Sequence, residues 1–270
     1  TGGIYKTKNK YPMLDLQVSA RNISGLNLLT LFPGSETLNP DFNFYKLKEH
    51  MIYGKAKGHV DIKGEANYPN LYGNALLTDV YLKKPIPNTT QNGVIKLSFD
   101  KHTMNIDVHV PTDKKEYVDV KGSFKLFRNR YSDITIKSTQ NIDLVKAYNV
   151  IMPLRDIFKF ELGPIPMMNI PAGSGNADFR IAGSRENPHA WGIINFRNGI
   201  ASFITINNMV AKNISGWVKF DGDKVIFKTD TASLNNLPIY IDGTCMLTGN
   251  LSVNVKGDNQ DSADLLKIIN

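Results

Sequence analysis

The sequence GEANYPNLYG at residues 64–73 returns as GSRENPHAWG at residues 183–192, and this pair indicates how the chain is built. The first glycine, the proline and the last glycine of one copy each lie 119 residues from their counterparts in the other. An apolar segment flanks each copy on both sides. Glycine permits unusual backbone angles, and proline pre-sets a turn and cannot donate to a strand ladder. The pattern therefore predicts two β-strands joined by a turn, present twice in the chain.

The same spacing continues beyond the turn. Further matched pairs, separated by 119 or 121 residues, are Gly54/Gly173, Ile62/Ile181, Phe99/Phe220 and Gly122/Gly243. We therefore expect about two tandem repeats of about 120 residues each, a period far longer than that of leucine-rich or propeller repeats. Residues 1–53 would be the end of a preceding repeat, 54–172 a full repeat, and 173–270 a second repeat truncated in its closing helix. The chain is thus expected to be an excerpt of a longer protein.

Apolar and polar residues alternate with a period of two over most of the chain, which is typical of half-buried strands. In the first repeat the alternation predicts strands at residues 58–64, 72–82, 94–99, 104–110, 117–127 and 132–138. In the second repeat it predicts strands at 177–183, 191–203, 216–220, 224–229, 239–247 and 251–257. We predict a mainly β protein, an elongated antiparallel meander with one apolar face and one wet face.

The remaining segments lack this alternation. Residues 1–12 are expected to be irregular and are followed by a strand around Leu14, Leu16 and Val18. Residues 22–33 are interpreted as a short helix or turn, and residues 158–170, rich in proline and glycine, as a loop. Short capping helices are expected at residues 141–149 and 261–270.

Composition narrows the possible functions. Apolar residues make up 41% of the chain, which suits strands with one buried face better than a deep two-sided core. No apolar run reaches the roughly 18–20 residues that a membrane-spanning helix requires. The net charge of +7 is compatible with nucleic acid or anionic lipid as a partner. Because the lysines stand singly along the predicted strands rather than in clusters, we expect no nucleic-acid partner.

The residues that usually carry chemistry show no recognisable pattern. The five histidines have no metal-ligand spacing, and the carboxylates are scattered singly on the predicted wet faces. The single cysteine excludes an internal disulfide and a cysteine zinc cluster. We therefore expect no catalytic residues, no metal and no cofactor.

The apolar face is the distinctive feature, because a sheet cannot leave a large apolar surface uncovered. The sheet could fold onto a second sheet, close into a barrel, or curl into a trough that holds an apolar ligand. The sequence pattern alone leaves these three alternatives open.

Three motifs in the second repeat, in this order, resemble a known family: KNISGWVKFDGD at 212–223, PIYIDG at 238–243 and DLL at 264–266. Together with the glycine–proline–glycine turn, this succession is similar to the AsmA-like and TamB-like proteins of diderm bacteria and their organelle descendants. The resemblance covers nearly the whole chain, twice over, and lies in the order of the motifs.

The resemblance implies a long β-sheet rolled into an open, taco-like groove with an apolar inner surface. Such proteins span the periplasm from an inner-membrane anchor, and phospholipid acyl chains are thought to slide along the groove between the inner and outer membranes. TamB-like proteins also pair with an Omp85-family barrel and are linked to outer-membrane protein assembly. The expected function is therefore non-enzymatic lipid transport. A chaperone module for outer-membrane proteins and a structural β-sandwich are the alternatives.

The matched apolar positions of the two repeats predict which side chains face the lipid. The expected groove-lining residues are Val60, Ile62, Ala75, Leu77, Leu97, Phe99, Ile106, Val108, Ile181, Ile194, Phe196, Val218, Phe220, Phe227, Ile239 and Ile241.

Overall fold

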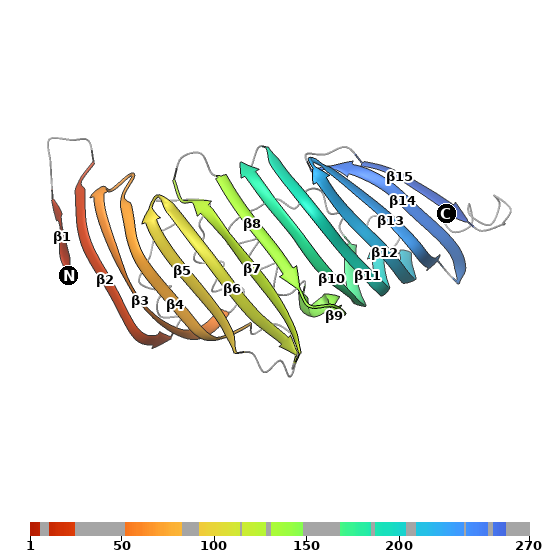
Figure 1. Ribbon diagram of the computed structural model, residues 1–270, viewed down its shortest axis with the longest axis horizontal. Helices are drawn as coiled ribbons and strands as arrows, with labels where there is room; N and C mark the ends of the chain where they lie inside the picture. Colours follow the sequence, from red (N-terminus) through yellow and green to blue (C-terminus); the bar gives the residue numbers. More distant parts are fainter. Residues whose placement is uncertain are drawn as a thin grey trace. The chain divides into compact units, whose positions relative to one another are not determined.

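The structure is a computed structural model, and its described residues are almost entirely β (Figure 1). The fifteen strands within the described residues belong to one antiparallel, open sheet and follow one another in sequence order, except that β8 is followed by β10 and β9 pairs with β10 outside this order. The strands therefore form the meander that the alternation predicts. The structure describes residues 1–5, 11–24, 52–82, 92–113, 115–127, 131–147, 168–184, 187–203, 209–234, 236–247 and 251–257.

The described residues fall into two compact units, residues 1–135 and residues 136–257. The strands of the first unit are β1 (Gly2–Tyr5), β2 (Met13–Ser24), β3 (Ile52–Glu65), β4 (Asn70–Leu82), β5 (Gly93–Lys101), β6 (Thr103–Asp113), β7 (Glu116–Lys125) and the beginning of β8 (Tyr131–Ser138). The expected segment boundaries at residues 54 and 173 lie inside strands, the first in Ile52–Glu65 and the second in Met168–Ser184.

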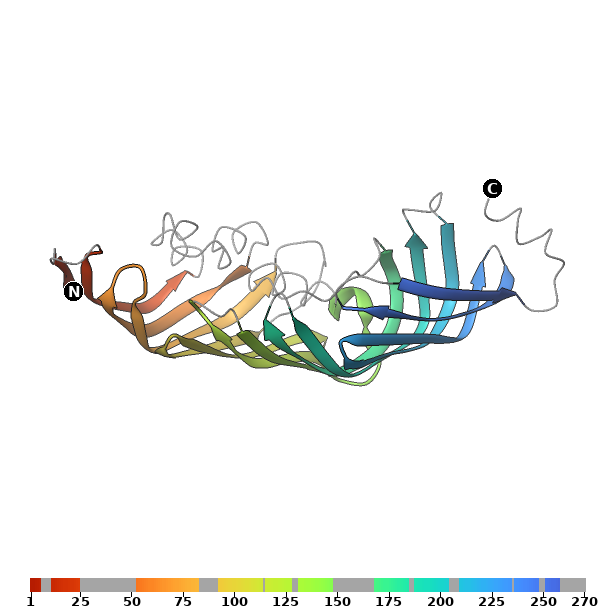
Figure 2. The same ribbon diagram turned by 90° about the horizontal axis from the view of Figure 1, so that it is seen from above.

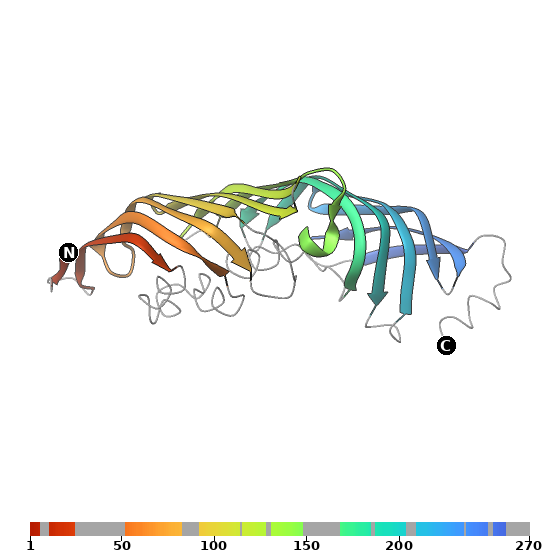
Figure 3. The ribbon, with the colours of Figure 1, turned by 90° about the horizontal axis from the view of Figure 1, so that it is seen from below.

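The second unit contains the end of β8 and the remaining strands. These are β9 (Ile142–Asp143), β10 (Met168–Ser184), β11 (Pro188–Phe203), β12 (Met209–Gly222), β13 (Lys224–Leu234), β14 (Leu237–Met246) and β15 (Leu251–Gly257). Figure 2 shows that β10, β11 and β12 bend along their length. A helical turn at residues 144–147 follows β9 and lies inside this bend (Figure 3).

The repeated glycine–proline–glycine stretch forms the turn between neighbouring strands in both copies. Tyr68 N donates to Glu65 O at 3.0 Å, and Asn187 N donates to Ser184 O at 3.2 Å, again 119 residues further on. The glycine that opens each stretch has a positive φ, as do Gly73 and Gly192 at the other end of the stretch. The two copies thus share a backbone conformation as well as a sequence pattern.

Several strands contain β-bulges, and these recur at the 119-residue spacing of the sequence repeat. Asp79 has a φ of +55° and Asn198 a φ of +51°, and a register shift of the following strand pair accompanies each. A second register shift occurs at Gly54 in β3 and at Gly173 in β10. A bulge adds one unpaired residue and bends the strand. The equal spacing shows that the two units bend their strands at equivalent positions.

Several sequence-based expectations were wrong at strand ends. Residues 1–12 were expected to be irregular but contain β1, and β10 begins at Met168, inside the expected loop at 158–170. β2 continues to Ser24, into the expected helix or turn at 22–33. The strands β10, β12 and β13 are longer than predicted because each contains bulges. A bulge shifts the alternation of apolar and polar residues by one position, so the sequence pattern breaks off although the strand continues. The remainder of the 22–33 segment and all of the helix expected at 261–270 lie outside the described residues.

Candidate apolar binding face

Strand register places the expected lining residues of the first unit on one face of the sheet. Directly paired residues of an antiparallel sheet share a face. Ala75 pairs with Leu97, and Leu97 pairs with Ile106, so a row of apolar side chains crosses three strands. Neighbouring rows lie two residues away along each strand, because side chains alternate between faces. Every residue expected for this unit lies on this apolar face: Val60, Ile62, Ala75, Leu77, Leu97, Phe99, Ile106 and Val108.

The second unit has the same arrangement. Ile194 pairs with Val218, and Val218 pairs with Phe227. Each expected residue again lies on one face: Ile181, Ile194, Phe196, Val218, Phe220, Phe227, Ile239 and Ile241. We use the term apolar face for this side of the sheet in both units and the term outer face for the opposite side.

Exposure of the apolar face varies from strand to strand. In the first unit Val108 is 1% exposed and Val118 is fully buried, whereas Ile4 on β1 is 67% exposed. In the second unit Ile239 is 3% exposed and Val255 on β15 is 52% exposed. Apolar surface in contact with water costs free energy in proportion to its area, about 25 cal/mol per Å². The face therefore favours contact with apolar groups most strongly near β1 and β15.

Some residues of the apolar face were missed by the sequence analysis. Phe179 on β10 is 3% exposed and pairs with Gly192 on the apolar face. It lies 119 residues after Val60, so the repeat spacing contained the signal for it. Leu144, in the helical turn, packs over Gly173 and Gly175, where a Cβ on either glycine would lie 3.2 or 3.0 Å from its methyl groups. The sequence carried no sign of this contact, because the helical turn and β10 lie far apart in the chain.

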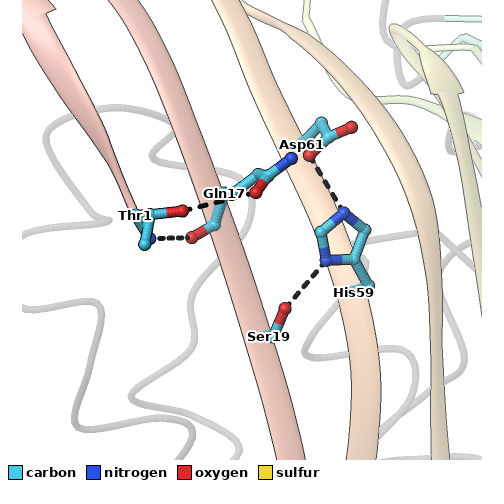
Figure 4. A network of polar contacts seen from close by, with 5 residues as sticks. All are labelled: Thr1, Gln17, Ser19, His59 and Asp61. Carbon is cyan, nitrogen blue, oxygen red and sulfur yellow. Dashed lines mark hydrogen bonds and ion pairs between the residues drawn. The ribbon is translucent and has the colours of Figure 1, made fainter.

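The outer face carries polar ladders between strands. In the first unit, Ser19 Oγ lies 2.8 Å from His59 Nδ1, and His59 Nε2 lies 3.0 Å from Asp61 Oδ1 (Figure 4). Beside these residues the Thr1 amino group donates to Gln17 O at 2.9 Å. Serine, histidine and carboxylate side chains in contact can form a proton relay. Here Ser19 and His59 are both exposed, so water competes for their hydrogen bonds. The Ser19–His59 contact is that expected of a cross-strand pair that supports pairing of β2 with β3, and the His59–Asp61 contact lies within β3.

Further polar contacts of partly exposed side chains continue this pattern. His109 Nδ1 lies 2.7 Å from Asp119 Oδ1, and in the second unit Lys137 Nζ lies 3.0 Å from Asp178 Oδ2. An exposed pair contributes at most about 1 kcal/mol to stability. On the outer face such contacts bring opposite charges of neighbouring strands together without contributing much to stability.

Chemically reactive groups are sparse in the described part of the chain. Among its histidine, cysteine and acidic residues, no group of three or more is placed to hold a metal ion. Cys245 lies on the apolar face beside Val225 and Leu251, and burial raises the pKa of its thiol. Within the described ranges, no helix has the length and apolar character needed to cross a membrane.

Comparisons of this chain with protein-family models, with curated proteins and with solved structures found no match. The candidate site therefore rests on the geometry of the two apolar faces and on the ordered motifs in the sequence.

Proposed function

We propose that this chain is a segment of a lipid-transfer protein whose apolar face holds phospholipid acyl chains and lets them move between two membranes. One observation carries the proposal. In each unit, every side chain expected to contact lipid lies on one face of an open sheet, while charged residues such as Lys63 and Lys219 occupy the other. An open sheet with this division offers an apolar path that crosses its strands.

The energetics suit movement along the path. Transfer of an acyl chain from water to an apolar surface is favourable by about 0.8 kcal/mol per CH₂, so a tail of about 16 carbons gains on the order of 12 kcal/mol. Rows of valine, isoleucine, leucine and phenylalanine would give the tail apolar neighbours on successive strands, and the most accessible of these contacts lie near β1 and β15. A tail can then slide without leaving an apolar environment, and the step requires no catalytic residue.

The recurring backbone features support a repeated architecture. In our proposal the sheet curls into an open, taco-like groove made of about two tandem repeats of about 120 residues, with short helices as caps. The turn hydrogen bonds, bulges and positive φ angles that recur at the 119-residue spacing are the supporting observations. Leu144, packed on Gly173 and Gly175, is an example of how a cap would seal the groove floor.

The resemblance to AsmA-like and TamB-like proteins supplies the cellular setting of the proposal. The chain would lie in the periplasm as part of a protein anchored in the inner membrane, and it would act without enzymatic activity. Its partners would be phospholipid acyl chains, the inner and outer membranes, and, for a TamB-like protein, an Omp85-family barrel.

A second candidate function is a chaperone for outer-membrane proteins. It is favoured by the exposed Val253 and Val255 on β15, a strand that among the described residues pairs only with β14. A strand edge of this kind can add a strand from another chain.

Photo-crosslinking tests the two candidates. A photoreactive amino acid replaces Leu77 or Phe196 on the apolar face, and Lys63 or Lys219 on the outer face serves as the control. We expect phospholipid adducts, identified by mass spectrometry, from the apolar positions and few from the controls. Equal labelling of both faces would contradict the lipid proposal, and polypeptide adducts from the apolar positions would favour the chaperone.

A charge on the apolar face provides a functional test. Leu77→Asp and Phe196→Asp place a carboxylate where acyl chains would pass, at half-buried positions that can retain their strand pairing. Both variants should reduce lipid transfer between vesicle populations while the β circular dichroism spectrum is unchanged. Transfer at the rate of the unmodified chain by both variants would contradict the proposal.

A further inference from the structure

Both tryptophans of the chain lie on the outer face of the second unit. Trp191 on β11 stands between Ala190 and Gly192, which belong to the apolar face, so its side chain projects to the opposite side. Trp217 on β12 alternates in the same way with Val218. The face expected to be polar therefore carries the two largest aromatic side chains of the protein.

In the register of the strands, an isoleucine lies next to both tryptophan positions. Ile193 lies two residues after Trp191, and it pairs with Lys219, which lies two residues after Trp217. Ile193 and Trp217 are thus diagonal neighbours, a separation that long side chains span. Trp191 is 43% exposed and Ile193 is 36% exposed. We name Trp191, Ile193 and Trp217 the tryptophan patch.

The first unit has polar counterparts at these positions. The residues at the repeat spacing are Tyr72 for Trp191, Asn74 for Ile193 and Lys96 for Trp217. The same backbone therefore folds with a tyrosine, an asparagine and a lysine at these positions, so the two tryptophans and Ile193 are not required by the architecture. An exposed cluster that the fold does not need is typical of a binding surface.

Cations border the tryptophan patch. Arg180 pairs with Trp191, and its guanidinium carbon lies 5.9 Å from the indole centroid. Lys219 pairs with Ile193, and Lys228 pairs with Trp217. Carboxylates border the patch as well: Asp221 pairs with Trp191, and Asp178 pairs with Ile193 and lies 3.0 Å from Lys137 Nζ. Lys224 in turn pairs with Asp221. With Lys137 and Lys224 included, cations outnumber carboxylates around the patch, which favours a negatively charged partner.

We propose that the tryptophan patch docks the second unit on the surface of an anionic phospholipid bilayer. Indole rings favour the membrane–water interface, where the ring meets acyl chains and the N–H remains hydrated. Lysine and arginine beside them are attracted to anionic headgroups. The sheet surface presents these groups side by side, which matches a plane of headgroups. The inference is separate from the proposed lipid transfer, because it uses the opposite face of the sheet.

Intrinsic fluorescence tests the proposal directly, because the only two tryptophans are both in the patch. The 270-residue chain is mixed with vesicles of phosphatidylglycerol and phosphatidylcholine, or of phosphatidylcholine alone. We expect a blue shift of the emission and quenching by brominated lipid with the anionic vesicles only. Absence of both effects would overturn the proposal, and a shift with polyglutamate instead of vesicles would identify an acidic protein as the partner.

Charge reversal distinguishes binding at the tryptophan patch from a general attraction between a basic protein and an anionic membrane. Lys219→Glu with Lys228→Glu should weaken vesicle binding by about tenfold or more, because each cation near an anionic surface contributes to the affinity. The matched control is Lys57→Glu with Lys63→Glu, which makes the same change of charge on the outer face of the first unit. Equal weakening by both pairs would overturn the docking site. Phe196→Asp, on the apolar face, should leave docking unchanged even if it blocks transfer, which separates this inference from the proposed function.

Discussion

Phe179 and Phe220 stack on each other across Gly192, with ring centroids 5.2 Å apart and an interplanar angle of 22°. Both residues pair with Gly192, one from β10 and the other from β12. A Cβ on Gly192 would lie 2.6 Å from Phe179 Cα and 2.8 Å from Phe179 Cβ. The glycine thus leaves the space that lets two aromatic rings from non-adjacent strands meet on the apolar face.

Gly192→Ala should lower the stability of the second unit. The new methyl group collides with Phe179, and the φ of +124° is unfavourable for any residue with a side chain. We expect a loss of more than about 1 kcal/mol in the free energy of unfolding, measured by urea denaturation. Gly199→Ala is the control, because its nearest contact is 3.3 Å and its φ is not in the positive region. Equal losses for the two variants would contradict the role of Gly192.

Thr229 joins β13 to β14 where their regular pairing is interrupted. Its hydroxyl accepts a hydrogen bond from Ile241 N at 2.8 Å and donates one to Ile241 O at 3.2 Å. Thr229→Val keeps the shape but leaves both backbone groups without this partner, which should cost about 1–3 kcal/mol. Thr231→Val, at an exposed position, should cost less. Chemical denaturation gives the free energy of unfolding of both variants. An unchanged free energy for Thr229→Val would show that these two hydrogen bonds do not stabilise the pairing of β13 with β14.

Asp143 stabilises the start of the helical turn that follows β9. Its Oδ1 accepts hydrogen bonds from Val145 N at 2.8 Å and from Lys146 N at 3.1 Å. Asp143→Ala should cost about 1 kcal/mol, whereas Asp143→Asn retains an acceptor and should cost less. Hydrogen exchange of the Val145 and Lys146 amides should accelerate in the alanine variant. Unchanged exchange would show that the turn does not depend on this cap.

Cys245 provides a pH-dependent probe of the apolar face. Burial raises the pKa of its thiol, so at a given pH the folded chain has less of the reactive thiolate than the unfolded chain. Reaction with a disulfide reagent near pH 8 should therefore be slower in native protein than in denaturant, and the native rate should rise as pH increases. Equal reaction rates in native protein and in denaturant would contradict the raised pKa. Cys245→Ser, which has no thiol, gives the background rate of the reagent.

Much of the candidate site could be predicted because strand periodicity is a local property. Leu97 and Ile106 were assigned to one face from alternation alone, and the register pairs them directly. Met168, by contrast, was placed in a loop, because proline and glycine in the preceding residues concealed the start of β10. The contact of Leu144 with Gly173 was not predictable, since no local pattern relates a helical turn to a strand that begins much later.

The sequence by itself determined the β class, the apolar side of each strand and the 119-residue spacing of the turns, because these follow from side-chain alternation and from glycine and proline chemistry. Only the tertiary structure decided which side chains meet across strands. Phe179 reaches Phe220, and Ile193 becomes a diagonal neighbour of Trp217, through a register that depends on hydrogen bonds between separate segments. Bulges shift that register by single residues, so the sequence pattern of one strand cannot specify its partners.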